Sequence, residues 1–212
     1  MCDLRTYLKM EIYRKGDRRW IRSFSDYYIT KATVKFEDET KSVGNIIAQV
    51  LGSIGTLEES MDSRIVTKNF EGVEETVSVK GTGTGELKVT AHVREDVFKK
   101  AYGMEFEALK DGVYAYGKNS KHKYFCFTAE VQDEYERVKY RAYPRCIITD
   151  GIARKTENGA DEVAQVEFTI KVTPDEKGNG LYEATLEELQ DATLKQNWIE
   201  KFNIADVYEE AA

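Results

Sequence analysis

The chain is poor in the residue types that carry most enzyme chemistry. Its 212 residues include only two histidines, three cysteines and two prolines. Any histidine-dependent mechanism would therefore have two candidates, His92 and His122, and the polar surroundings of both predict surface side chains. Cys2, Cys126 and Cys146 are odd in number and widely spaced, which argues against a disulfide framework. We expect reduced cysteines, with Cys126 and Cys146 packed in the interior.

Long uncharged stretches are missing as well. No segment approaches the roughly 18 apolar residues that a membrane-spanning helix requires, and the first residues lack the apolar region of a secretory signal. These absences predict a protein that is made in a cytoplasm and has no membrane span.

The sequence lacks the spacings typical of metal, nucleotide and hydrolase sites. His122 and Cys126 would share a strand face, and Cys146 could join them around zinc, but no CxxC or HExxH motif supports such a site. The glycines of 81–85 follow GxGxG rather than GxGxxG and precede a strand. Nothing singles out a catalytic pair among the 38 carboxylates. We expect no catalytic residue, no cofactor and no metal site.

What the chain does contain is alternation of apolar and polar residues, which predicts a β-rich protein. A hairpin is expected at 7–24, and the glycines of 81–85 read as a flexible hinge between two strands. Pro144 indicates an edge or a bulge in its strand. The remaining strands are expected at 27–36, 64–70, 73–80, 86–93, 125–131, 138–149 and 166–172.

Three segments have helical spacing. Apolar residues at spacings of three and four predict a helix over 43–55, which either packs on the chain's own sheet or docks on a neighbouring copy, with a linker at 58–63 after it. Asp96 is expected to cap a short helix that ends at Gly103. A capping box at 185–188 predicts a helix running to about Asn203. We expect a tube-like β domain over 1–184, with an inserted loop or helix at 41–61, and an acidic helical tail over 185–212.

The net charge of −7 is unevenly distributed. Residues 1–35 contain nine basic and four acidic side chains, whereas 174–212 contain three basic and ten acidic ones. These are either two solvated surface segments or complementary surfaces for head-to-tail association. The candidate inter-subunit residues are the basic Arg14, Lys15, Arg18, Arg19 and Arg22 and the apolar Ile46, Ile47, Val50, Leu51 and Ile54.

The order of these elements resembles a known family. The segments 77–103, 123–127, 140–146 and 165–170 are similar to the major tail tube protein of long-tailed, siphovirus-type bacteriophages, and the resemblance covers about 62–180. The hairpin at 7–24 also resembles that family, whereas 43–55 and 185–212 depart from its compact members.

The resemblance implies a mainly β fold, a β-sandwich or barrel with a short flanking helix. It implies a structural subunit of a virion tail, assembled in the host cytoplasm into stacked hexameric rings that conduct DNA during ejection. Its partners would be further copies, a tape-measure protein, and terminator and baseplate proteins. DNA would pass without specific binding, since lumen acids repel phosphate. The candidate lumen acids are Glu74, Glu75, Glu86, Glu130 and Asp133.

Other functions fit the same pattern. A tube protein of a contractile injection or secretion machine would have the same strands and charges. A monomeric carbohydrate-binding or adhesion module would use an aromatic patch, and a β-fold hydrolase would depend on one carboxylate.

Overall fold

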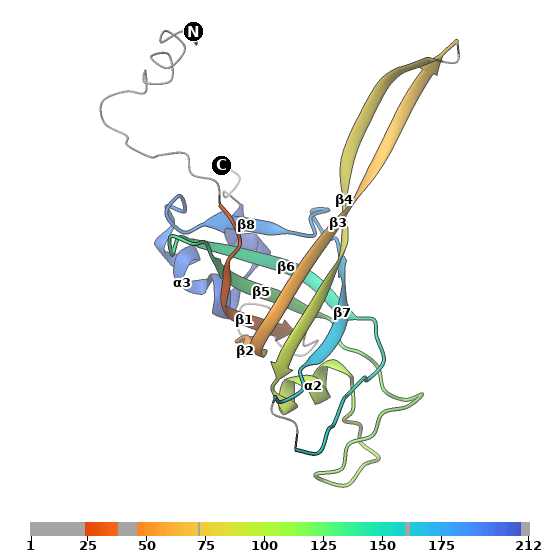
Figure 1. The fold of residues 1–212 in the computed structure, drawn as a ribbon, viewed down its shortest axis with the longest axis vertical. Coiled ribbons are helices and arrows are strands. Elements are labelled where there is room, and N and C mark those ends of the chain that lie inside the picture. The colour runs from red at the N-terminus through yellow and green to blue at the C-terminus, as the bar shows by residue number, and fades with distance from the viewer. Residues whose placement is uncertain (1–23, 38–45, 72, 160–161, 209–212) are drawn as a thin grey trace.

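The computed structural model describes residues 24–37, 46–71, 73–159 and 162–208, and it is mainly antiparallel β-sheet (Figure 1). The described elements are β1 (Tyr28–Phe36), β2 (Gln49–Val50), β3 (Gly52–Phe70), β4 (Val73–Val93), α2 (Glu95–Ala101), β5 (Phe125–Gln132), β6 (Val138–Ile148), β7 (Val166–Thr173), β8 (Tyr182–Thr185), α3 (Ala192–Lys201) and the 3-10 helix η2 (Ile204–Val207). The predicted mainly β fold with short helices is confirmed.

One sheet contains all eight described strands. Its order is β2-β1-β5-β6-β7-β4-β3, and β8 pairs with part of β6. Leu51 joins the two ends of the sheet: its N–H donates to the carbonyl of Ala32 at 3.0 Å, and its carbonyl accepts from Arg94 N–H at 2.8 Å. The sheet is therefore curled into a barrel that is held together at the end near β2.

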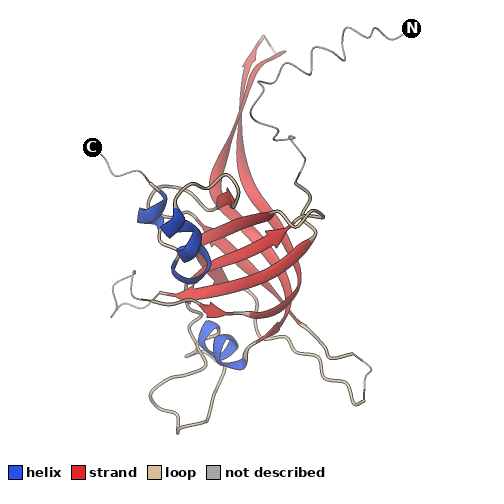
Figure 2. Cartoon of the chain, turned by 90° about the vertical axis from the view of Figure 1, so that its left-hand side faces the viewer, coloured by secondary structure: helices blue, strands red, loops and turns tan. Residues whose placement is uncertain are grey.

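Two apolar cores cover the two faces of this sheet. The interior of the barrel contains alternate residues of β4, β5 and β7, and α2 closes one end with Val97 and Phe98. On the outer face, α3 packs against β5 and β6 through Leu194, Trp198 and Phe202 (Figure 2). Helix cover on the outside explains why β5 is buried on both faces.

Most strand predictions are confirmed, with boundaries that differ by a few residues. The turn after α2 is also confirmed, since Gly103 has φ +59° and an added Cβ would lie 2.0 Å from the carbonyl oxygen of Lys121. The predicted cap is wrong: Arg94 occupies the N-cap position, and Asp96 lies in the first turn, where it accepts from Arg94 Nη2 at 2.8 Å.

Pro144 produces a bulge rather than an edge. β6 lies between β5 and β7, so it is an interior strand. Phe127 pairs with Tyr143 and Phe125 pairs with Cys146. Pro144 and Arg145 therefore face a single residue of β5, and the lost N–H of proline costs no ladder bond there.

The predicted helix over 43–55 is wrong where the structure describes it. Residues 46–48 have no regular structure, 49–50 form β2, and 52–55 begin β3; residues 43–45 lie outside the described ranges. Gly52 has φ +141° and contacts the backbone of His92 so closely that an added Cβ would lie 1.9 Å from its carbonyl oxygen. This close approach to β4 favours a strand, and the predicted linker at 58–63 is also part of β3.

The capping box at 185–188 does not begin a helix. Thr185 is the last residue of β8, and its carbonyl accepts from Glu188 N–H at 3.0 Å in a turn. α3 begins after Asp191, whose carboxylate accepts from Leu194 N–H at 2.8 Å. β-Pairing of Tyr182–Thr185 with β6 overrides the local helical pattern.

Candidate assembly surfaces

β3 and β4 extend well beyond the barrel. β4 pairs with β7 only from Gly85 to Ala91, whereas its pairing with β3 continues to Phe70 and Val73. Residues 63–81 therefore form a two-stranded hairpin that stands free of the sheet at one end of the molecule (Figure 1). This hairpin is called the arm below.

The arm leaves the sheet at the predicted glycine hinge, which is a β-bulge in a continuous strand. Met61 pairs with Gly85 and Ser63 with Gly81, so residues 82–84 face Asp62 alone. The Thr84 hydroxyl donates to the Asp62 carboxylate at 2.8 Å. Gly83 has φ +72°, and an added Cβ would lie 2.4 Å from the carbonyl oxygen of Gly178. Asp62 and the turn that contains Gly178 thus contact the bulge at the base of the arm.

The two faces of the arm differ in chemistry. Ile65 lies opposite Val79, and Val77 lies opposite Thr67 on the same face. Their exposed fractions are 63% for Ile65, 58% for Val79 and 51% for Val77. The other face places Arg64 opposite Lys80. A two-stranded hairpin has little stability of its own, and like charges opposite each other reduce it further.

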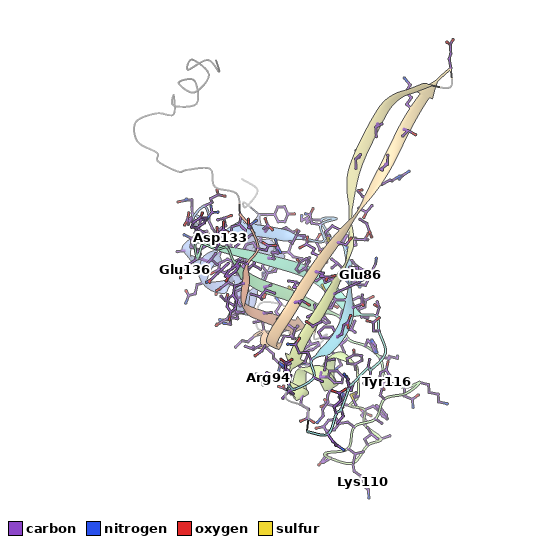
Figure 3. All side chains as sticks on the ribbon, viewed as in Figure 1. Glu86, Arg94, Lys110, Tyr116, Asp133 and Glu136 are labelled. Carbon is purple, nitrogen blue, oxygen red and sulfur yellow. The ribbon has the colours of Figure 1, made fainter. Side chains whose placement is uncertain are left out.

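A second group of exposed apolar side chains lies at the opposite end of the molecule. Residues 104–118, here called the foot loop, follow α2 and extend away from the arm, with Lys110 near their far end (Figure 3). Val113, Tyr114 and Tyr116 have exposed fractions of 52%, 38% and 45%. Ala115 N–H donates to the Met104 carbonyl at 3.2 Å, which closes the loop at its root.

His122 anchors the foot loop and is not the surface residue expected. Its Nδ1 donates to the carbonyl of Ile148 at 2.7 Å, and its Nε2 forms a hydrogen bond with the Tyr116 hydroxyl at 3.1 Å. Its ring also packs edge-on against Tyr102, with centroids 4.9 Å apart. His92, by contrast, is exposed as predicted.

The two described cysteines are buried, as expected, on opposite faces of the sheet. Cys126 belongs to the outer core and Cys146 to the interior of the barrel. Burial raises the pKa of Cys126 to about 12, which leaves it a thiol at neutral pH. Within the described ranges, the structure contains no group of three or more His, Cys, Asp or Glu that could hold a metal ion.

The five candidate lumen acids come from different parts of the fold. Glu74 and Glu75 lie in the β4 strand of the arm, next to its tip. Glu86 is exposed on β4, and Figure 3 shows it far from Asp133. Glu130 on β5 is half-buried and accepts from the Thr30 hydroxyl at 2.5 Å. A shared lining surface would therefore require several copies.

The carboxylate of Asp133 is not exposed. It is buried in the turn between β5 and β6 and accepts from the N–H groups of Tyr135 and Arg137 at 2.9 Å and 2.8 Å. Arg137 Nε also donates to it at 2.6 Å. Burial alone would raise the pKa of Asp133, but these hydrogen bonds outweigh that effect and hold its pKa below the usual value. The negative charge of Asp133 therefore stabilises the turn between β5 and β6 and is not exposed on the surface.

Some of the candidate inter-subunit residues lie on the surface, one lies in the core, and the others lie outside the described residues. Arg14, Lys15, Arg18, Arg19 and Arg22 lie outside the described residues. Ile47 and Val50 are exposed, Ile46 and Ile54 are half-buried, and Leu51 is in the core. Leu51 is therefore part of the fold rather than of a surface.

A partly exposed ion cluster around Arg141, beside β3, was missed in the sequence. Arg141 of β6 donates to Asp26 at 2.8 Å and to Glu183 at 3.0 Å. Glu59 of β3 lies 3.9 Å from Arg141 and accepts from the Tyr143 hydroxyl. The alternating charges on separate strands do not indicate that these four side chains lie close together in the fold. The cluster borders an opening of about 240 Å³ between β1 and β3.

None of the described helices is long and apolar enough to cross a membrane. No family model and no curated protein matches the sequence. Among solved structures, the chain is similar to the cap that terminates the tube of the anti-feeding prophage, with 8% identity, a TM-score of 0.39, and 77% of this chain and 95% of that chain covered. It is also similar to a chain of the anti-feeding prophage baseplate, with 9% identity, a TM-score of 0.35 and coverages of 73% and 92%. Both similarities are remote.

Proposed function

We propose that this chain is a non-enzymatic structural subunit of a phage-type tail tube, which assembles with copies of itself. The observation that carries the proposal is the arm: residues 63–81 project from the barrel with an apolar face that no other described part of the chain covers. An exposed apolar surface on a marginally stable hairpin is typical of a segment that a partner completes.

Burial of this face favours association energetically. A fully buried valine or isoleucine contributes about 1.5–3 kcal/mol. Ile65, Val77 and Val79 are each more than half exposed, so docking would gain roughly 1 kcal/mol for each side chain. One such contact is weak, whereas a closed ring or stack repeats it in every copy.

The position of the arm favours stacking over closed dimers. It projects from one end of the molecule, so an arm that contacts a different surface of the next copy makes a heterologous contact. Heterologous contacts generate rings when they close and filaments when they do not. A tube combines the two kinds of contact, because subunits close into rings and the rings stack on one another. The family resemblance implies six subunits in each ring.

The charge of the chain suits a conduit for DNA. The protein is acidic, with a net charge of −7, so it would bind duplex DNA weakly. Glu86 is exposed on β4 and Glu74 and Glu75 lie near the arm tip, where copies in a ring could bring them to one inner surface. Carboxylates there would repel phosphate and let DNA pass without binding. The same arrangement would serve the tube of a contractile injection machine.

The second candidate function is carbohydrate binding by a monomer. Tyr27 and Tyr28 are exposed beside the opening between β1 and β3, and aromatic rings of this kind stack on sugars. This function needs no self-association, so the state of assembly separates the two candidates.

The test is negative-stain electron microscopy with sedimentation velocity on the purified full-length chain over a range of concentrations. We expect rings or hollow tubes. The triple variant Ile65→Ser, Val77→Ser, Val79→Ser should remain monomeric, whereas the matched control Val163→Ser, which changes an exposed valine outside the arm, should assemble normally. A wild-type protein that stays monomeric at every concentration contradicts the proposal.

A further inference from the structure

We propose that the arm of one copy docks on the foot loop of a second copy. The inference rests on the proposed self-assembly and names the two surfaces that meet. The arm and the foot loop lie at opposite ends of the longest axis of the molecule, so a copy placed above another brings its foot loop to the arm below (Figures 1 and 3). Within one chain, they cannot reach each other.

Both surfaces present apolar side chains that the chain leaves half-exposed. The arm offers Ile65, Val77 and Val79, and the foot loop offers Val113 and Tyr116. Aromatic side chains against β-branched ones on a strand face form favourable cross-strand pairs. His122 holds Tyr116 from behind, so that ring is oriented before docking and loses little freedom on binding.

The charges on the other face of the arm are opposite in sign to the acids of the foot loop. Arg64 and Lys80 lie opposite each other on the arm. The foot loop carries three exposed acids, Glu105, Glu107 and Asp111, and two exposed bases, Lys110 and Lys118. Carboxylates brought to Arg64 and Lys80 would relieve the repulsion between these two bases. A foot loop that docks on the apolar face and wraps around an edge of the hairpin would thus bring its acids to the bases on the other face.

Pairing of one arm with another fits less well. Two arms joined edge to edge would bring Arg64 and Lys80 of one copy next to the same bases of its partner. Such an isologous contact would also close a dimer, leave both foot loops uncovered and stop further growth.

Disulfide trapping between two differently sized copies tests the inference. One full-length chain carries Val79→Cys, and a second chain with a solubility tag carries Val113→Cys; both also carry Cys2→Ser. Cys126 and Cys146 are buried and do not interfere. After mixing and mild oxidation, we expect at least about tenfold more mixed disulfide than with the control pair Val79→Cys and Gln196→Cys, because docking raises the local thiol concentration. Gln196 is exposed on α3, away from both surfaces.

The outcomes distinguish this inference from the proposed function. Rings or tubes by microscopy without the mixed disulfide would overturn the docking while leaving self-assembly in place. A dominant Val79→Cys homodimer would show that arms pair with arms, which also overturns it. A mixture that neither assembles nor cross-links would overturn both the docking and the tube.

A charge-reversal series supplies an independent readout. The double variant Arg64→Glu, Lys80→Glu should reduce the mixed disulfide at least about tenfold. Adding Glu105→Lys, Glu107→Lys and Asp111→Lys to the foot-loop chain should restore it. Rescue supports the pairing of these two surfaces, and a loss that the reversed foot loop leaves unchanged contradicts it.

Discussion

The Tyr143 hydroxyl donates a hydrogen bond to the Glu59 carboxylate at 2.5 Å. Tyr143 belongs to a central strand, and Glu59 belongs to β3 a few residues below the arm. Burial and the adjacent carboxylate raise the pKa of Tyr143, so the phenol remains protonated and donates. This bond attaches the root of the arm to the middle of the barrel.

Removing Glu59 should therefore destabilise the fold. Glu59→Ala leaves the buried Tyr143 hydroxyl without its acceptor and should lower the free energy of unfolding by about 1–3 kcal/mol. Tyr143→Phe removes the donor instead and should cost less, and the double variant should cost less than the sum of the two. Urea denaturation of the four proteins measures the coupling, and strict additivity would contradict a bond between these side chains.

Trp198 should be the most sensitive residue of the outer core. It is buried between Tyr140, whose ring centroid lies 6.0 Å away, and Phe202, at 5.0 Å. Trp198→Ala opens a large cavity and should cost about 3–5 kcal/mol of unfolding free energy.

Trp198→Phe is the matched control. Among the described atoms the indole Nε1 has no hydrogen-bond partner, so phenylalanine loses packing area but no hydrogen bond. It should cost clearly less than alanine when both are measured by thermal or chemical denaturation. Equal losses would contradict a mainly apolar role for this side chain.

Gly83 should not tolerate a side chain, whereas Gly81 should. Gly83→Ala places Cβ in a left-handed backbone conformation and against the Gly178 carbonyl, which should cost roughly 1–3 kcal/mol. Gly81→Ala lies two residues away with no atom within 4 Å of its added Cβ. Thermal unfolding of the two variants compares them directly. Similar midpoints would show that the bulge does not need the glycine.

Asp133 should give the protein part of its pH dependence. Its pKa is lowered in the folded state, so its stabilising effect is present above the unfolded pKa of about 3.9 and is lost as the pH falls through the lower folded pKa. Asp133→Asn should unfold at a lower temperature than the wild type at pH 7, and the gap should narrow below about pH 4. Thermal unfolding from pH 7 to pH 3 tests this, with the exposed Glu134→Gln as control; a gap that stays constant with pH would contradict it.

The sequence by itself determined most of the strands and the chemistry of their faces, but not β2, β8 or the first part of β3. Alternation at Leu87, Val89 and Ala91 and along 166–172 predicts which side chains enter the barrel, because the side-chain period of a strand is two and burial selects one face. Gly103 likewise marked a turn, and Pro144 an edge or a bulge, through backbone restrictions that are local to each residue.

Only the tertiary structure decided which strands pair and which side chains lie next to one another. Residues 49–50 and 52–55 belong to a segment with helical spacing but form strands, because pairing with β1 and β4 satisfies more backbone groups than an isolated turn of helix could. The order of the strands in the sheet brings Arg141 close to Asp26, Glu59 and Glu183. The same order lets the arm project past β7. Local periodicity carries no information about that order, since the same alternating strand can pair with many neighbours.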